Sequence, residues 1–144
     1  AMALSPLLRT GLVLAGAGLP AGRPGGDDGL LTGEELLGVD LSGVRLVVLS
    51  ACETGLGEIE DGEGVMGLRR ALTLAGAESL VLSLWTVPDA PTRALMAAMY
   101  ARLAAGASPA EALRGAQLDA IEAARSAGRA ANPFDWAAFV VSGG

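Results

Sequence analysis

The chain has 144 residues with 16 acids and ten bases, every base is an arginine, and the formal net charge is −6. A single cysteine excludes an internal disulfide framework, and because histidine is also absent, a zinc site of the usual ligand sets is excluded. The acidic balance argues against a grip on nucleic-acid phosphates, and no apolar run is long enough for a membrane span. A lone unpaired thiol is typical of a reducing compartment, so we expect a cytoplasmic protein.

The N-terminal part of the chain alternates short apolar runs with polar stretches. Residues 1–3 lack the charged start of a signal peptide and are interpreted as a cloning remnant. The run 12–15 is apolar, and 16–29 is rich in Gly, Pro and Asp, which is typical of a flexible loop. Residues 30–39 are expected to hold a short helix with Thr32 as its N-cap.

A strand, a helix and a second strand are predicted next. Residues 44–50 are nearly continuous in apolar side chains, which is typical of a strand covered on both faces. From about Glu63, apolar residues recur at helical spacing, and Gly76 stands where a helix-ending glycine belongs. A second buried strand is predicted over 79–87.

Two helices and a last strand complete the order of elements. The first of these helices is predicted to be capped by Asp89 and to carry one apolar face. The members of that face are Leu95, Met99 and Leu103. Residues 108–111 read Ser-Pro-Ala-Glu, a capping box that predicts a helix to about residue 127, and 136–142 is predicted as a strand. Strands alternating with helices over short connections predict an α/β fold with a largely parallel sheet flanked by helices.

The thiol comes directly after the first long strand. This places Cys52 at the carboxyl end of a buried parallel strand, where open α/β sheets hold their reactive groups. Gly55 and Gly57 allow a sharp turn whose N–H groups are suited to stabilising an oxyanion. The alternative is that Cys52 is a small buried hydrophobe. A nucleophilic thiol also needs a base or a positive neighbour, and in this chain only arginines could supply one.

Five acids lie close to the cysteine in the sequence. They would attract a basic substrate side chain or an activating partner, or else form a solvated turn before a helix N-terminus, which favours acids. In either role they oppose formation of the thiolate. The five are Glu53, Glu58, Glu60, Asp61 and Glu63.

Two further patterns were open to a functional interpretation. Residues 62–67 match the dinucleotide fingerprint G-x-G-x-x-G, with Asp89 at about the distance of a ribose-binding acid. The match does not begin directly at the end of a strand, and the nearby acids would repel a pyrophosphate, so we do not expect a nucleotide site. Trp85 and Trp136 stand at strand ends, where they either line a substrate groove or pack at the edge of the sheet.

The sequence around the thiol resembles a known family. Residues 46–57, Leu-Val-Val-Leu-Ser-Ala-Cys-Glu-Thr-Gly-Leu-Gly, resemble the nucleophile segment of CHAT domains, which belong with caspases and separases among the caspase-like cysteine peptidases. The resemblance covers nearly the whole chain. It continues through 62–65, 74–77, 83–85, 108–113 and 136–139, and upstream through 5–8, 11–16 and 29–32.

The resemblance implies a caspase-like three-layer α/β/α fold with a mostly parallel sheet, and peptide-bond cleavage by a Cys–His dyad with Cys52 as nucleophile. In the family, the histidine and the oxyanion glycine beside it lie in a segment upstream of the Ser5 region, and this chain has no histidine. We therefore expect 1–144 to be one partial domain, the C-terminal half, inactive alone and without a metal or organic cofactor. The alternative is a catalytically idle CHAT-like interaction or scaffold module.

The same resemblance suggests partners. A protein or peptide substrate and the missing N-terminal half of the domain are expected. Because the cysteine strand normally pairs with the histidine strand, its free edge is also expected to promote self-association.

Overall fold

The computed structural model describes residues 7, 10–15, 17, 28–50 and 63–144, with the backbone alone for 63–65. Contacts between residues divide the chain into two compact units. Unit 1 comprises residues 1–43 and 53–77, and unit 2 comprises 44–52 and 78–144.

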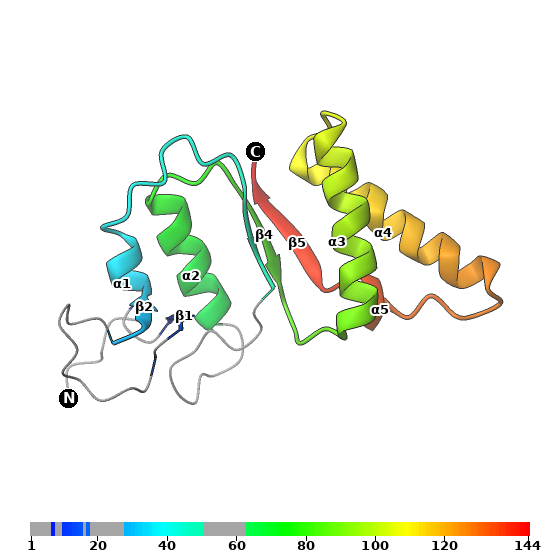
Figure 1. The fold of residues 1–144 in the computed structure, drawn as a ribbon, viewed down its shortest axis with the longest axis horizontal. Helices are drawn as coiled ribbons and strands as arrows, with labels where there is room; N and C mark the ends of the chain where they lie inside the picture. Colours follow the sequence, from blue (N-terminus) through cyan, green and yellow to red (C-terminus); the bar gives the residue numbers. More distant parts are fainter. Residues whose placement is uncertain (1–6, 8–9, 16, 18–27, 51–62) are drawn as a thin grey trace. The chain divides into compact units, whose positions relative to one another are not determined.

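Unit 1 holds a two-stranded sheet and two helices. Strand β1 (Gly11–Val13) pairs antiparallel with β2 (Leu30–Thr32), and helices α1 (Gly33–Leu36) and α2 (Glu63–Leu74) lie side by side (Figure 1). Part of the helix predicted over 30–39 is therefore strand, because residues 30–32 pair with β1 before the helix begins.

Thr32 caps α1 as predicted. Its hydroxyl accepts a hydrogen bond from the Glu35 N–H at 3.2 Å, and the Glu35 carboxylate accepts one from the Thr32 N–H at 2.8 Å. The two bonds form a complete capping box, which fixes where β2 gives way to the helix.

Helix α2 starts at Glu63 and ends at the predicted glycine. Gly76 has φ +108°, its N–H donates to the Thr73 carbonyl at 3.1 Å, and the Ala77 N–H donates to the Leu72 carbonyl at 3.2 Å. This pair of bonds is a Schellman motif, which a glycine in the left-handed region permits. The buried face of the helix consists of Leu68, Ala71 and Leu72.

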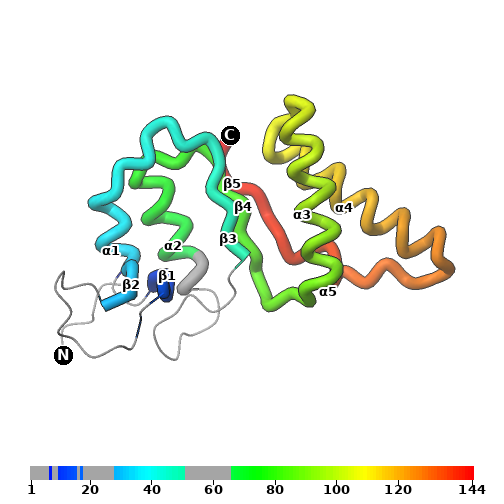
Figure 2. Tube along the Cα trace, viewed as in Figure 1, coloured from blue at the N-terminus to red at the C-terminus, as the bar shows by residue number. Residues whose placement is uncertain are grey.

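Unit 2 contains a three-stranded sheet with the order β3–β4–β5 (Figure 2). Strand β3 (Val47–Leu49) is parallel to β4 (Ser79–Ser83), and β5 (Phe139–Gly143) is antiparallel to β4. Of the three strand pairings among the described residues, one is parallel and two are antiparallel. The chain has the expected mixture of sheets and helices, but the prediction of a mostly parallel sheet is wrong.

The connections explain the direction of each strand. In the chain one long helix, α2, stands between β3 and β4, which matches the crossover that parallel strands require. Between β4 and β5 the chain forms α3 (Asp89–Ala104) and α4 (Pro109–Ser126), a helical hairpin that returns it to the end where β4 finished (Figure 1). Strand β5 must therefore run back against β4.

The helices α3 and α4 cover one face of this sheet. Leu95 and Met99 of the predicted apolar face are buried, and Leu103 packs against the same core. Ser108 and Glu111 form the predicted capping box at the start of α4. The buried cluster consists of Val81, Leu95, Met99, Ala112, Leu113, Ala116, Ala138 and Phe139.

Several predicted boundaries are corrected. Strand β4 stops at Ser83 rather than 87, and the residue that caps α3 is Pro88, without a side-chain hydrogen bond, so Asp89 is the first residue of that helix. Residues 133–136 form a short helix, α5 (Pro133–Trp136), and the last strand begins only at Phe139.

Candidate functional site

The candidate site lies where β3 and β4 end together. The two strands are parallel, with Leu49 beside Leu82, so their carboxyl ends meet at one edge of the sheet. Open α/β sheets bind ligands at such an edge. All five residues of β4 are buried, whereas β3 is only partly buried, contrary to the prediction of a strand covered on both faces.

Most of the predicted site residues lie outside the described part of the chain. These are Cys52, Glu53, Gly55, Gly57, Glu58, Glu60 and Asp61. Glu63 is the first residue of α2, and its side chain is likewise outside the described part. Their predicted roles stay predictions. The last described residue before the thiol is Ser50.

An aromatic pair lies at the same edge of the sheet. Trp85 comes two residues after the end of β4, and its ring stacks on that of Phe134 from α5, with centroids 6.4 Å apart and planes at 19°. The Trp85 indole N–H also donates to the Phe134 carbonyl oxygen at 3.4 Å. Of the two roles open for Trp85, packing at the sheet edge is confirmed, since it is partly buried against the core cluster.

Helix α5 holds Phe134 in place although it is only four residues long. The Asn132 side-chain oxygen accepts from the Phe134 N–H at 3.1 Å, and Pro133 occupies the first helical position. The Trp136 indole N–H donates to the Ala131 carbonyl at 3.3 Å. Asn followed by Pro is a typical helix start, so the sequence carried a signal for α5 that the prediction of a strand overlooked.

The start of β5 is fixed at the same edge. The Leu84 N–H donates to the Ala138 carbonyl at 2.8 Å, and the Gln117 side-chain amide donates from α4 to the Phe139 carbonyl at 3.1 Å. These bonds tie the chain just beyond β4 to the start of β5 and tie α4 to the same strand.

Two exposed carboxyl groups have lowered pKa values. Hydrogen bonds from the Ser108 side chain and backbone lower the pKa of Glu111, and hydrogen bonds from the side chain and backbone of Ser42 lower that of Asp40. Both are hydrogen-bonded turn or cap residues that stabilise local backbone. Neither lies in the segments that form the edge.

The described residues were also searched for other kinds of site. They hold no group of three or more acidic or sulfur ligands placed for a metal ion, and none of their helices is long and apolar enough to cross a membrane. The dinucleotide-like pattern does not form a strand-to-helix turn, because Gly64 and Gly67 lie inside α2. A Cβ at Gly67 would lie 3.0 Å from the Thr10 side chain, so this glycine allows close packing.

Comparison with known proteins gives one family and two relatives. The family model for the CHAT domain matches residues 1–144. Tetratricopeptide repeat protein 28 of Mus musculus is 33% identical over 114 residues, and that of Homo sapiens is 32% identical over 114 residues. The aligned segment is 79% of this chain but only 4% of either relative.

Proposed function

The chain belongs to the CHAT domain family, which is caspase-like, and on this premise we propose that it carries the nucleophile of a cysteine peptidase. The observation that supports the proposal is the position of the only cysteine. In the sequence Cys52 comes three residues after Leu49, the last residue of β3, and the parallel strands β3 and β4 end at the same edge of the sheet. A thiol held there is presented by a sheet, which positions reactive groups precisely.

The reaction proposed is acyl transfer followed by hydrolysis. The Cys52 thiolate attacks the carbonyl carbon of a peptide bond, the amine leaves with a proton from a general acid, and a thioester remains on the sulfur. Water then attacks the thioester, gives up a proton to the same group acting as base, and releases the carboxylic acid and the thiolate. Each half of the cycle returns the proton that the other used.

The proton-transfer group must come from outside these residues. The 144 residues contain no histidine, and the acids near Cys52 in the sequence disfavour the thiolate. We therefore propose that a histidine-bearing segment completes the site. Strand β3 is the end strand of the three-stranded sheet among the described residues, and an end strand offers backbone N–H and C=O groups to an added strand. The segment would pair there, and in its absence a second copy would compete for the same edge.

The test is the reactivity of the thiol. The alkylation rate of Cys52 by iodoacetamide is measured against pH for the 144-residue chain, with and without the histidine-bearing segment, and for the urea-unfolded chain. With the segment, we expect the midpoint of the rate to fall below the free-thiol pKa of about 8.5. Cys52→Ser is the control, since it removes the only cysteine. A rate equal to that of the unfolded chain under every condition contradicts the proposal.

The alternative is a CHAT-like interaction module whose cysteine is idle. It is favoured by the names of the two relatives, which describe tetratricopeptide repeats and no peptidase. In that case this chain would act through protein contacts alone, and Cys52→Ala would leave its activity in the cell unchanged. The same substitution abolishes the activity if the chain is a peptidase.

A further inference from the structure

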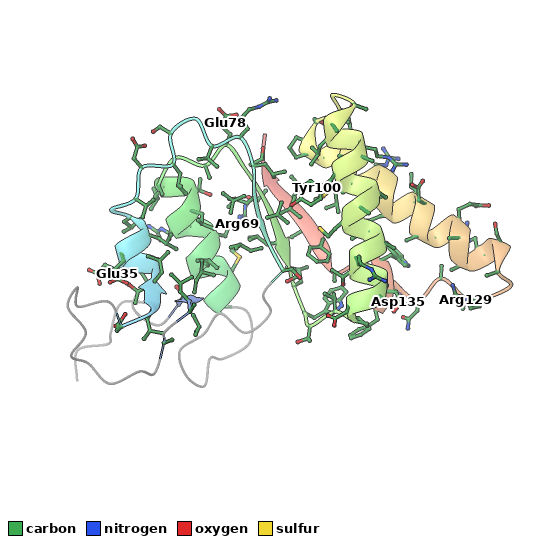
Figure 3. The ribbon with its side chains drawn as sticks, viewed as in Figure 1. Glu35, Arg69, Glu78, Tyr100, Arg129 and Asp135 are labelled. Carbon is green, nitrogen blue, oxygen red and sulfur yellow. The ribbon has the colours of Figure 1, made fainter. Side chains whose placement is uncertain are left out.

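The hydrogen bonds of β4 determine which main-chain groups of β3 are left at the end of the sheet. On the β5 side of β4, the Leu84 N–H donates to the Ala138 carbonyl at 2.8 Å, and the carbonyl of Glu78, labelled in Figure 3, accepts from the Gly144 N–H at 3.2 Å. Successive residues of a strand direct their N–H and C=O groups alternately to the two sides. The even-numbered residues of β4 therefore face β5, and the odd-numbered residues face β3.

The register then assigns a direction to each residue of β3. Val48 lies beside Val81, and in a parallel pair an odd-numbered residue such as Val81 bonds to the two neighbours of its partner, which are Val47 and Leu49. The N–H and C=O of Val48 therefore point away from β4. Because β4 is the only described strand beside β3, no described residue uses these two groups.

The side chains of β3 are those of a strand with neighbours on both sides. All three of its residues are partly exposed, although Val48 packs against the buried cluster, whereas the middle strand β4 is fully buried. End strands of a sheet are usually blunted by charged residues, proline or bulges. Residues 46–49 read Leu-Val-Val-Leu, with no charge and no proline, and such a continuous apolar run is typical of an interior strand.

The opposite end of the sheet is better protected. Because Ala138 faces β4, the outward main-chain groups of β5 belong to Phe139, Val141 and Gly143. The Phe139 carbonyl accepts a hydrogen bond from the Gln117 side-chain amide at 3.1 Å, and Gly143 has φ +85°, outside the extended region. A further strand is therefore added more readily at β3 than at β5.

From these observations we propose that the free edge of β3 is an interaction surface for a β-strand that is apolar on both faces and pairs with the main chain of Val48. A strand is the occupant because an extended backbone supplies donors and acceptors in the alternation that this edge offers. Both of its faces are apolar because Val47 and Val48, which point to opposite faces of the sheet, are both partly exposed. The inference rests on the proposed function only for identifying this strand with part of the histidine-bearing segment.

Hydrogen exchange tests the direction of the main chain in the 144-residue chain itself. Amide exchange along β3 is followed residue by residue by NMR. Since the Val47 and Leu49 amides are bonded to β4 and the Val48 amide is not, we expect Val48 to exchange at least about tenfold faster than its two neighbours. Equal protection of all three amides overturns the inference.

Binding is tested with a blocked peptide that has an apolar run of alternating valine and leucine and a lysine at each end. Two control peptides keep the lysines: one has serine at every second apolar position, and the other is methylated at every main-chain nitrogen. We expect the first peptide to bind at least about tenfold more tightly than either control, because the controls lose apolar burial or main-chain hydrogen bonds. It should slow exchange at Val48 and leave Val141 unchanged.

Two proline variants give a matched pair on one strand. Val48→Pro removes an N–H that no described residue uses, so it should keep the thermal midpoint close to that of the unchanged chain and abolish peptide binding. Val47→Pro removes an N–H that pairs with β4, so it should lower the thermal midpoint. If Val48→Pro lowers the midpoint as far as Val47→Pro does, the assignment of the edge is wrong.

The remaining outcomes separate this inference from the proposed function. Equal binding of the three peptides, or protection of Val141 in place of Val48, overturns the inference. Protection of Val48 that rises with the concentration of the chain and does not respond to the peptide assigns the edge to a second copy, which also overturns it. An unreactive Cys52 together with peptide binding at Val48 contradicts the peptidase and leaves β3 as a strand-binding surface.

Discussion

Two glycines that end helices differ in their surroundings, and this difference predicts a difference in stability. Gly76 has φ +108° and Gly106 has φ +94°, and each closes its helix with the same pair of Schellman hydrogen bonds. A Cβ at Gly106 would meet nothing within 4 Å, whereas one at Gly76 would lie 3.0 Å from the Ser42 backbone nitrogen and 3.3 Å from the Leu41 carbonyl carbon. Backbone atoms cannot rotate aside as a side chain can.

The magnitudes follow from these contacts. Alanine at positive φ costs about 1–2 kcal/mol, partly offset by about 0.4–1 kcal/mol because the unfolded chain loses freedom. Gly106→Ala should therefore cost about 1 kcal/mol. Gly76→Ala adds a backbone clash and endangers the hydrogen bond from the Leu41 N–H to the Ala75 carbonyl at 2.8 Å, which is worth about 1 kcal/mol. Its total should be about 2–3 kcal/mol.

The assay is urea unfolding followed by both circular dichroism and tryptophan fluorescence. Both tryptophans belong to unit 2, so fluorescence reports Gly106→Ala directly, while circular dichroism also reports unit 1, which contains Gly76. If Gly76→Ala costs no more than Gly106→Ala, the contact argument is refuted, because both glycines have positive φ and the same pair of cap hydrogen bonds.

Three other changes test the core, a cap and a buried hydroxyl. Met99 is fully buried, so Met99→Ala should lower the free energy of unfolding by about 2–5 kcal/mol in urea titrations; a loss below 1 kcal/mol would contradict its place in the core. Hydrogen bonds from Ser108 lower the pKa of Glu111 from its usual 4.5, so their stabilising effect is full above that pH and is lost as the pH falls below it. Glu111→Gln should flatten this part of the stability–pH curve, and an unchanged slope would count against the assignment. The Thr10 hydroxyl is buried without a hydrogen-bond partner among the described residues. Thr10→Val should therefore raise the free energy of unfolding by about 1 kcal/mol, which is seen as a higher thermal midpoint. A lower midpoint would show that the hydroxyl is satisfied.

Local signals in the sequence predicted the helix boundaries best. Thr32, Gly76 and Ser108 act within a few residues of themselves, and each has the predicted role in the structure. Asp89 was less reliable because the extended Pro88 already starts the helix, and an acid in the first turn serves the helix dipole without capping it.

The direction of β5 relative to β4 is set by the helices that connect them, and the residue pattern of the strands does not reveal it. Between 79–83 and 139–143 stand two long helices, and a hairpin of two helices returns the chain to the edge it left. The order of elements contained this information, but the strands were assigned as parallel from the α/β alternation alone. The apolar composition of β5 did not help, since buried strands look alike in either direction.

The sequence predicted the nucleophile of the candidate site and the strand before it, but not the aromatic pair at the end of β4. A strand just before the thiol could be predicted from the apolar run over 44–50, and the structure has the shorter strand β3, which ends at Leu49, three residues before Cys52. Phe134 was not identified, because it lies 49 residues from Trp85 in sequence, and the two meet only in the folded chain, through the ring stack and the indole hydrogen bond. A contact over such a separation leaves no periodic signal in one sequence.

Cleavage of a peptide substrate tests the central claim most directly. The 144-residue chain and the same chain joined by its histidine-bearing segment are each incubated with unfolded protein substrates and with short peptides, and the products are identified by mass spectrometry. The account predicts no turnover by the 144 residues alone, turnover by the completed protein, and complete loss of that turnover in Cys52→Ala. Cleavage by the completed protein that persists in Cys52→Ala would contradict the account.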